Sequence, residues 1–528
     1  MKRYTIILSI VAGMFLSSCT DFLNVTTEKS PNGGNYFATD KDATDAVNAC
    51  YWVFYFEQTF GRDLLWEQVG GDDITFGTNR GGLFDNLYNY NYVGTENGVQ
   101  GAWTYFNNYL ARANWVVYNL LKKANLSPVE TVRLGEAYFM RAFCHFFIAY
   151  RYGRADQGAP FDRYEDYSPY EYQIPEQRAT VMDNYALIIE DLEQAAARLP
   201  FFENYSEDDY GRAHKAAAWA YMVKVYAYWA QHDASKWDLI PALVDKIETE
   251  GRRNLLNNFA DVFTIANNWT SEYIWSVNSS GHNMAGSELP GIMLENKAWG
   301  RYNGWGSLKP TLNLFEEYTS NDLRRGVTLL SFNDEFVLFG ETRRYTSSSD
   351  LAIGFQLAKY MEPYTYGSVV GGVGANNPYI SSNGDRPTTD LNIPLIRHAE
   401  MVLFKAEALV MKGQGAQAAA ELNKLTARAG LGNLYTNATL DNLKHERRCE
   451  LAGEFTDRFM DLKRWGDWAI LNQPHRGREY DDRNDPTSSY TDYNIRPARN
   501  FNPSTDIVFP YPPDDVTKAN GKLKQNPQ

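Results

Sequence analysis

Two segments of the chain bring aromatic rings together with side chains that donate or accept hydrogen bonds. One runs from Asp72 to Tyr92 and is interrupted by glycines, and the other runs from Trp299 to Trp305 with glycines between the rings. Aromatic faces pack against apolar C–H surfaces, whereas Asp, Asn and Arg hydrogen-bond to hydroxyl groups. A sugar offers both kinds of surface, so these segments predict a glycan-binding site. The candidate ligand-binding residues are Asp72, Asp73, Asn79, Arg80, Tyr90, Tyr92, Trp299, Arg301, Tyr302 and Trp305.

The same rings have a second interpretation, in which Tyr90 and Trp305 are anchors of the core or of the loops. Substitutions separate the two interpretations. We predict that Trp299→Ala or Trp305→Ala weakens glycan binding and leaves folding intact. Unchanged affinity for the identified glycan in both variants would remove the second segment from the site.

Motifs for catalysis and for cofactors are missing from the sequence. The seven histidines are scattered without an H-E-x-x-H pair, and there is no G-x-S-x-G nucleophile elbow. Gly372-Val373-Gly374 lacks the third glycine of a dinucleotide loop, and Asp72-Asp73-Ile74 lacks the spacing of an EF-hand. We therefore predict no catalytic residues and no cofactor. Loop carboxylates would suit a structural calcium ion, but no motif supports one.

A glycosidase is the serious enzymatic alternative. It requires two carboxyl groups that face each other across the glycosidic bond, about 5 to 9.5 Å apart. Adjacent residues such as Asp72/Asp73 or Glu316/Glu317 are expected to diverge, because neighbouring side chains point in different directions. A pair from distant segments remains open at the level of sequence, and we predict that the protein is not an enzyme.

Helical periodicity precedes and follows the second segment. Residues 101–123 and 128–152 are predicted helices, and the latter begins at Pro128 and stops before Gly153. Residues 177–199 and 212–231 are the next two, joined by short links. Residues 395–411 and 416–428 form a later pair around Gly413-Gln414-Gly415. Such pairs, with alanines at their contacts, resemble tetratricopeptide units, although no strict self-repeat is found.

Residues 253–392 lose the helical period and are rich in Gly, Asn, Ser and aromatic residues. Long loops on a rigid scaffold are where binding residues concentrate. The predicted fold class is mainly α, with a tetratricopeptide-like helical-hairpin scaffold and a long irregular loop region that contains short strands.

The N-terminus is predicted to be a targeting segment. Lys2 and Arg3 precede an apolar stretch from Tyr4 to Leu16, which is too short to span a bilayer. Leu16-Ser17-Ser18-Cys19 has the form of a bacterial lipobox, which predicts lipidation of Cys19 and removal of residues 1–18. The alternative is an ordinary secretory peptide with a chance cysteine. Residues 20–35 are polar and suit a tether between lipid and body.

Composition narrows the choice of partners. The formal net charge is −14, which argues against nucleic acid as a partner and against binding anionic lipid by charge. Aromatic residues make up 15% of the chain, with 36 Tyr and 13 Trp, which suits either exposed platforms or a large core. Cys50, Cys144 and Cys449 have no metal-ligand spacing and are predicted to be small buried hydrophobes, with at most one disulfide.

Five sets of motifs, in order along the chain, resemble those of the SusD/RagB family of outer-membrane nutrient-binding lipoproteins. Thr426, in place of a usual arginine, and an end at Gln528 instead of Gly-Tyr depart from the pattern, but neither lies at a candidate site. The matching segments are Cys19 to Leu23, Gly135 to Phe143, Leu395 to Ala408, Glu446 to Leu451 with Asp457 to Gly466, and Phe509 to Pro512 with Gln525 to Pro527.

The resemblance implies a SusD-like fold in which residues 36–528 form one domain. Its helical scaffold would cover about 40–250 and 393–470, and its loop-rich ligand-binding region about 251–392. It also implies a lipid-anchored position on the outer membrane, facing the exterior, and a SusC-like TonB-dependent transporter that receives the captured oligosaccharide. Arg447, Arg448, Glu450 and Arg458 of the family signature are expected to form ion pairs that clamp helices.

Three other functions compete with glycan capture. A peptide-capturing member of the same family would need fewer stacked rings. A secreted glycosidase would need the paired carboxyls described above. A helical-repeat scaffold without a small ligand would not need a long aromatic loop region. The sequence therefore favours a cell-surface protein that captures oligosaccharide and does not cleave it.

Overall fold

The computed structural model describes residues 36–60, 66–76, 82–165, 175–279, 308–338, 341–346, 353–362, 389–454, 458–485 and 487–527. All structural statements below refer to these residues. Within them, no helix has an apolar stretch long enough to cross a membrane.

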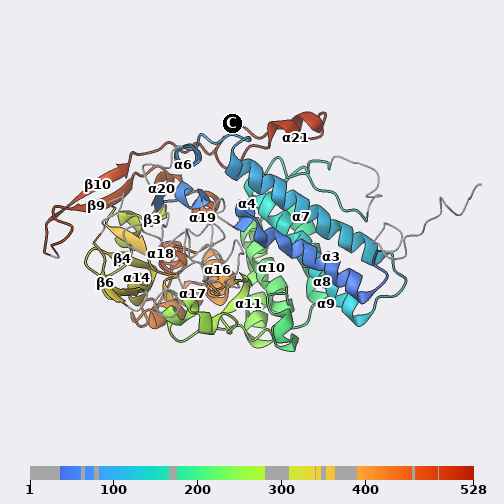
Figure 1. The fold of residues 1–528 in the computed structure, drawn as a ribbon, viewed down its shortest axis with the longest axis horizontal. Coiled ribbons are helices and arrows are strands. Elements are labelled where there is room, and N and C mark those ends of the chain that lie inside the picture. Colours follow the sequence, from blue (N-terminus) through green and yellow to red (C-terminus); the bar gives the residue numbers. More distant parts are fainter. Residues whose placement is uncertain are drawn as a thin grey trace, which may run out of the picture.

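One half of the molecule is a layer of long helices that lie side by side (Figure 1). Helix α8 runs along its centre between α7 and α9 and is buried on almost every face. Its buried phenylalanines form one continuous core with the neighbouring helices. The helices of this half are α3 (Asp40–Tyr51), α7 (Asn97–Leu121), α8 (Pro128–Tyr152), α9 (Val181–Arg198), α10 (Lys215–Trp229) and α11 (Ile240–Thr249).

Capping residues explain where several of these helices begin. Thr39, Ser127, Thr180 and Thr439 each accept a hydrogen bond from the third residue of the helix, whose own side chain reaches back to the cap. Pro128 then occupies the first turn of α8, where its missing N–H is not needed. The sequence predicted α8 with its observed bounds, whereas α9 begins at the Thr180 cap and not at residue 177.

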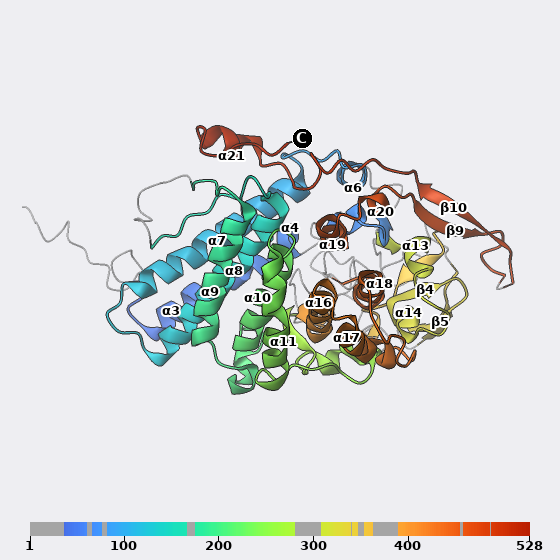
Figure 2. The same cartoon turned by 180° about the vertical axis from the view of Figure 1, so that it is seen from behind.

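The other half contains the second helical set, seen in front in Figure 2. Helix α16 packs against α17 and α18, with small alanines such as Ala399 and Ala406 at the contacts. The predicted helix 395–411 was wrong at its start, because residues up to Arg397 belong to a strand. The helices of this half are α16 (His398–Met411), α17 (Gly415–Arg428), α18 (Leu440–Leu451), α19 (Arg458–Trp465) and α20 (Trp468–Leu471).

Strands occur only as two-stranded antiparallel pairs in the described part of the chain, in agreement with the predicted mainly helical fold with short strands. Strand β8 pairs with β2 and is buried along its whole length, so its apolar run could not be told from a buried helix. The pairs are β1 (Ile74–Phe76) with β3 (Leu308–Pro310), β2 (Tyr273–Val277) with β8 (Ile393–Arg397), β4 (Leu329–Ser331) with β7 (Phe355–Leu357), β5 (Glu335–Leu338) with β6 (Glu341–Arg344), and β9 (His475–Tyr480) with β10 (Tyr490–Arg496).

Short elements connect these layers. The 3₁₀ helix η1 follows α3 directly, and α13 and α14 lie between β3 and β4. The short elements are η1 (Trp52–Tyr55), α4 (Glu57–Phe60), η2 (Trp66–Gly70), α6 (Leu83–Tyr88), η3 (Phe202–Asn204), η4 (Glu207–Asp209), η5 (Ala234–Leu239), η6 (Phe259–Phe263), η7 (Ile265–Asn267), α13 (Leu312–Phe315), α14 (Leu323–Thr328) and α21 (Pro513–Lys518).

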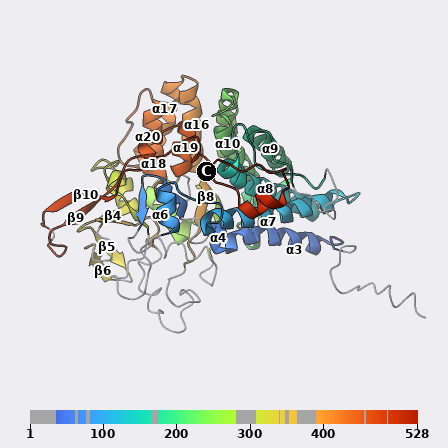
Figure 3. The ribbon, with the colours of Figure 1, turned by 90° about the horizontal axis from the view of Figure 1, so that it is seen from above.

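The C-terminal segment crosses over the first helical half, and Figure 3 shows α21 over α7 and α8. Trp103 of α7 donates its indole N–H to Asp515, 2.8 Å away. Asn526 donates to the carbonyl oxygens of Tyr152 and Phe509, each 2.8 Å away. A Cβ at Gly94 would lie 2.3 Å from the carbonyl oxygen of Tyr511, so only glycine permits this close approach. The segment thereby fastens the end of α8.

Candidate functional site

Asp72 and Asp73 are buried beneath two arginines of the family-like signature. The Arg448 guanidinium lies 2.7 Å from Asp73 Oδ1 and 2.8 Å from Asp72 Oδ2. Arg458 Nε lies 2.9 Å from Asp72 Oδ1. Burial alone would raise the pKa of Asp72, but the charges of Arg448 and Arg458 hold it below its ordinary value. Burial raises the pKa of Asp73, because it outweighs the attraction of Arg448.

The expectation that Asp72 and Asp73 diverge was therefore wrong. Both precede strand β1 in an irregular bend, where the alternation of a regular strand does not apply, and both carboxylates converge on Arg448. The cavity beside Asp73 and Arg448 has a volume of only about 20 Å³, which is about enough for one water molecule. These buried carboxylates position the chain around β1, and their ligand-binding role stays a prediction.

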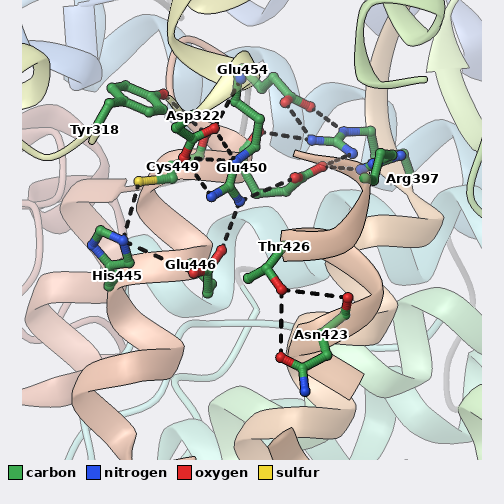
Figure 4. A network of polar contacts seen from close by, with 12 residues as sticks. Tyr318, Asp322, Arg397, Asn423, Thr426, His445, Glu446, Cys449, Glu450 and Glu454 are labelled. Atoms are coloured by element: carbon green, nitrogen blue, oxygen red, sulfur yellow. Dashed lines mark hydrogen bonds and ion pairs between the residues drawn. The ribbon is translucent and has the colours of Figure 1, made fainter. Parts of the chain in front are cut away.

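Ion pairs of this kind continue through the second half of the molecule, as predicted for Arg447, Arg448, Glu450 and Arg458. Arg447 Nε contacts Asp461 Oδ2 at 2.5 Å and Arg447 Nη2 contacts Glu400 Oε1 at 2.9 Å. Arg397 reaches Glu450 Oε1 at 2.8 Å (Figure 4). These residues are almost completely buried, so the signature holds helices together.

Acid is expected to weaken this network. Burial raises the pKa of Glu450, but Arg428, Arg397 and Arg324 outweigh it and lower that pKa from 4.5 to about 2. The folded state depresses the pKa of Glu450, so the ionised carboxylate stabilises the fold fully above about pH 4.5. This stabilisation is lost as the pH falls toward 2. We expect protonation of Glu450 to lower the free energy of unfolding by about 2 kcal/mol between about pH 6 and about pH 3. Urea unfolding at the two pH values measures the loss.

Glu450→Gln supplies the comparison for that measurement, because glutamine does not titrate. The variant is less stable at neutral pH, but its stability falls less steeply on acidification. Parallel pH profiles for the parent protein and the variant would contradict the assignment of this pH dependence to Glu450.

Tyr90 and Tyr92 are packed in the core, with 6% and 7% of their surface exposed. The Tyr90 hydroxyl donates to the carbonyl oxygens of Gly70 and Leu471, 3.1 and 2.9 Å away. The Tyr92 hydroxyl donates to the carbonyl oxygen of Asp506, 2.7 Å away. Both act as anchors, which is the second interpretation given above. Their ligand-binding role stays a prediction without support from their placement.

The remaining candidate residues lie outside the described part of the chain: Cys19, Asn79, Arg80, Trp299, Arg301, Tyr302 and Trp305. The described residues that flank them are informative. Phe76 precedes residues 77–81, Leu308 follows residues 299–307, and these two residues pair in the β1–β3 sheet. The two candidate segments are therefore attached to neighbouring positions of one small sheet, which the Asp72 and Asp73 ion pairs hold in place.

A cavity of about 640 Å³ opens beside α3 and η1, and we call it the aromatic pocket. Trp52 and Tyr55 are exposed there, by 59% and 43%, and their ring centroids lie 6.2 Å apart with planes tilted by 37°. Its volume lies in the range of about 300–1,000 Å³ that is usual for small-ligand sites. The lining residues are Asn48, Tyr51, Trp52, Phe54, Tyr55, Asp208, Tyr210, Gly211, Arg212, Ser276 and Asn278.

The backbone of η1 places the two exposed rings together. In a 3₁₀ helix, residues three apart point in the same direction, so Trp52 and Tyr55 share one side of η1. Phe54 packs edge-on against Trp275, with ring centroids 5.2 Å apart. The Tyr51 hydroxyl donates to Glu136 Oε2 at 2.8 Å and accepts from the Ala213 N–H at 2.9 Å. Buried neighbours thus fix the platform from which Trp52 and Tyr55 project.

Polar groups also line the aromatic pocket. Arg212 donates to Asp209 Oδ1 at 2.7 Å and to Glu136 Oε2 at 3.1 Å, which fixes its guanidinium in the wall. Gly211 has φ of 96° and packs against the Asn278 amide, where a Cβ would lie 1.5 Å from Nδ2. Only glycine allows this contact. Asn278 and Asp208 therefore add an amide and a carboxylate group to the lining of the pocket.

The pocket suits binding better than catalysis. Aromatic faces and amide or carboxylate groups can hold a sugar by stacking and hydrogen bonding. Asp208 is the only carboxylate among the described lining residues, whereas glycoside hydrolysis requires two. The sequence analysis missed Trp52 and Tyr55, because residues 51–56 are nearly all aromatic and their exposure depends on the 3₁₀ turn.

Comparisons with known proteins match this chain along most of its length. A family model described as "SusD family" matches residues 360–528, and one described as "Starch-binding associating with outer membrane" matches residues 79–227. A curated relative, SusD-like protein P2 from Formosa agariphila, is 26% identical, and the alignment covers 100% of both chains.

Solved structures share the helical fold. A SusD-like protein from Bacteroides fragilis superimposes with a TM-score of 0.76 at 18% identity, and the match covers 94% of this chain and 98% of that one. Surface glycan-binding protein A from Bacteroides thetaiotaomicron, in complex with laminarihexaose, gives a TM-score of 0.69 at 22% identity. That match covers 92% of this chain and 99% of the other. At these identities the structural likeness establishes the fold.

Proposed function

The chain belongs to the SusD family, and from that premise we propose that it captures oligosaccharide at the bacterial surface for import. This family consists of binding proteins, and the chain is accordingly not an enzyme. One family description places such proteins at the outer membrane and names starch as ligand, and one structural neighbour was solved with laminarihexaose.

The aromatic pocket is the observation that carries the proposal. Trp52 and Tyr55 present two exposed rings in a cavity of about 640 Å³, with Asn278 and Asp208 on its wall. Trp52 and Tyr55 lie side by side and form one exposed aromatic surface, and contiguous exposed apolar patches mark binding sites, unlike singly exposed residues. A peptide-binding function, the alternative within this family, would use fewer stacked rings.

The two segments identified in the sequence extend the proposed site. Residues 280–307 connect the pocket wall, which includes Asn278, to strand β3. Trp299, Arg301, Tyr302 and Trp305 belong to this connection, and Asn79 and Arg80 follow strand β1, the partner of β3. We propose that these residues add contacts to the sugar held at the aromatic pocket.

The proposal also covers where the protein lies in the cell and which protein receives the sugar from it. Lipidation of Cys19 would anchor the chain in the outer membrane, since each buried methylene contributes about 0.8 kcal/mol. Residues 20–35 would tether the body on the exterior side. A SusC-like TonB-dependent transporter would receive the oligosaccharide from the site. The support for this arrangement is the family and the Leu16-Ser17-Ser18-Cys19 motif.

An affinity-gel screen tests the function. The soluble form that begins after Cys19 is run through gels that contain neutral or acidic polysaccharides, and the polysaccharides are checked for shortening in parallel. We expect at least one glycan to retard the protein without being cleaved. Retention by peptides and by no glycan would replace the proposal with peptide capture, and release of shorter sugars would replace it with a glycosidase.

A further inference from the structure

Three side chains of metal-ligating type gather where α18 passes the turn that follows α13. They are Glu317, His445 and Cys449, and one ligand atom from each lies within 4.8 Å of the others. His445 and Cys449 are four residues apart in α18 and therefore share one helix face. Figure 4 shows the imidazole and the sulfur on the same side of that helix. The cluster does not overlap the aromatic pocket.

The distances come close to those of a tetrahedral zinc site. Cys449 Sγ lies 3.9 Å from His445 Nε2, the ring nitrogen that would face the ion, whereas Glu317 Oε1 hydrogen-bonds to the other ring nitrogen, Nδ1, 2.5 Å away. Zinc bonds of about 2.0–2.3 Å place neighbouring ligand atoms about 3.3–3.8 Å apart. One ligand atom from each residue lies within 4.8 Å of the other two. A rotation of the Glu317 carboxyl group away from Nδ1, with side-chain shifts of about 1 Å, would therefore bring Sγ, Nε2 and a Glu317 oxygen onto one ion. The His445 side chain is 32% exposed, which gives an ion and a water molecule access from solvent.

Surrounding groups hold two of these side chains in position. Arg448 Nη1 contacts Glu317 Oε2 at 2.6 Å and leaves Oε1 directed at the cluster. The Tyr318 hydroxyl donates to the Cys449 carbonyl oxygen at 2.9 Å, which fixes the last turn of α18. Glu446 Oε1 lies 4.0 Å from His445 Nε2 and adds negative charge nearby. Outer groups that orient ligands in this way are typical of metal sites.

We propose that Glu317, His445 and Cys449 bind one Zn²⁺ ion, with water as the fourth ligand. The mixed sulfur, nitrogen and oxygen set matches zinc, whereas Ca²⁺ and Mg²⁺ prefer oxygen alone. On binding, the Cys449 thiol gives its proton to solvent, so the thiolate and the Glu317 carboxylate together balance the charge of the ion. The ion would join α18 to the end of α13, next to the Arg448 contact that supports β1.

Metal titration of the full soluble chain tests the site. Protein stripped with a chelator is dialysed against Zn²⁺ and assayed for bound metal, and Co²⁺ is used as a spectroscopic probe. We expect one equivalent of Zn²⁺, a thiolate-to-Co²⁺ charge-transfer band, and a rise in melting temperature with Zn²⁺. Cys449→Ser and His445→Gln should each abolish the band and weaken Zn²⁺ binding by at least about tenfold.

Cys50→Ser is the matched control, because Cys50 is another buried thiol, whose Sγ donates to the Ala46 carbonyl oxygen, as a serine hydroxyl also can. It should bind Zn²⁺ like the parent protein. Glu317→Gln provides a second test if Cys449→Ser does not fold, since it keeps the thiol and removes the anionic oxygen. Less than one equivalent in the parent protein, or unchanged Zn²⁺ affinity in His445→Gln and Glu317→Gln, would overturn the proposal.

Discussion

Trp52→Ala is expected to weaken glycan binding by about 2 kcal/mol, or roughly 30-fold in Kd. The ring is 59% exposed and lies over the aromatic pocket, so its removal takes away stacking surface without opening a hole in the core. The double variant with Tyr55→Ala should lose more, because the two rings form one platform with centroids 6.2 Å apart. Titration calorimetry with the glycan selected in affinity gels measures both losses.

Trp468→Ala is the matched control for this prediction. Trp468 is also an exposed tryptophan, at 37%, but it lies on α20, away from the pocket. We expect it to bind glycan like the parent protein. Equal affinities of the parent protein, Trp52→Ala and the double variant would exclude the pocket as a glycan site, whereas retained melting temperatures would show that the variants are folded.

Arg397→Met is expected to destabilise the fold by about 3–5 kcal/mol. Arg397 is 1% exposed and contacts Glu272, Glu450 and Glu454 at 2.7 to 2.8 Å. Methionine fills similar space but leaves three buried carboxylates without this guanidinium, and an uncompensated buried charge is costly. Urea unfolding at neutral pH measures the change in free energy.

Lys41→Met is the control for the destabilisation predicted for Arg397→Met. Lys41 pairs with Asp45 on the surface of α3, where both side chains are exposed. Surface pairs contribute about 0–1 kcal/mol, so this variant should be close to the parent protein in stability. A loss below about 1 kcal/mol for Arg397→Met would mean that the buried network does not hold the second half of the molecule together as we infer.

Local signals in the sequence were sufficient for the long helices. Pro128 and Gly153 mark the ends of α8, because proline fixes a φ that suits the first helical turn, whereas the freedom of the glycine backbone disfavours continuing the helix. The start of α9 was misplaced, since the Thr180–Asp183 capping box was not weighed. Residues 395–397 were misassigned to a helix because a fully buried strand and a buried helix have the same apolar composition.

The site was harder to predict, because it depends on contacts between residues far apart in the chain. Asp72 and Asp73 have the composition of a sugar site, but their true partner, Arg448, lies hundreds of residues away. Tyr90 resembles an exposed platform in sequence and is buried by Phe459 and Phe501. Trp52 stands in an aromatic run whose neighbour Val53 is fully buried. Only the 3₁₀ turn decides which of these side chains faces outward.

The most direct test is calorimetric titration of the soluble chain with the oligosaccharide found in the screen, followed by mass spectrometry of the recovered ligand. We expect saturable binding at one site and recovery of the sugar at its original length. Recovery of shortened sugar, or the absence of saturable binding for every glycan and oligosaccharide tried, would contradict capture without cleavage.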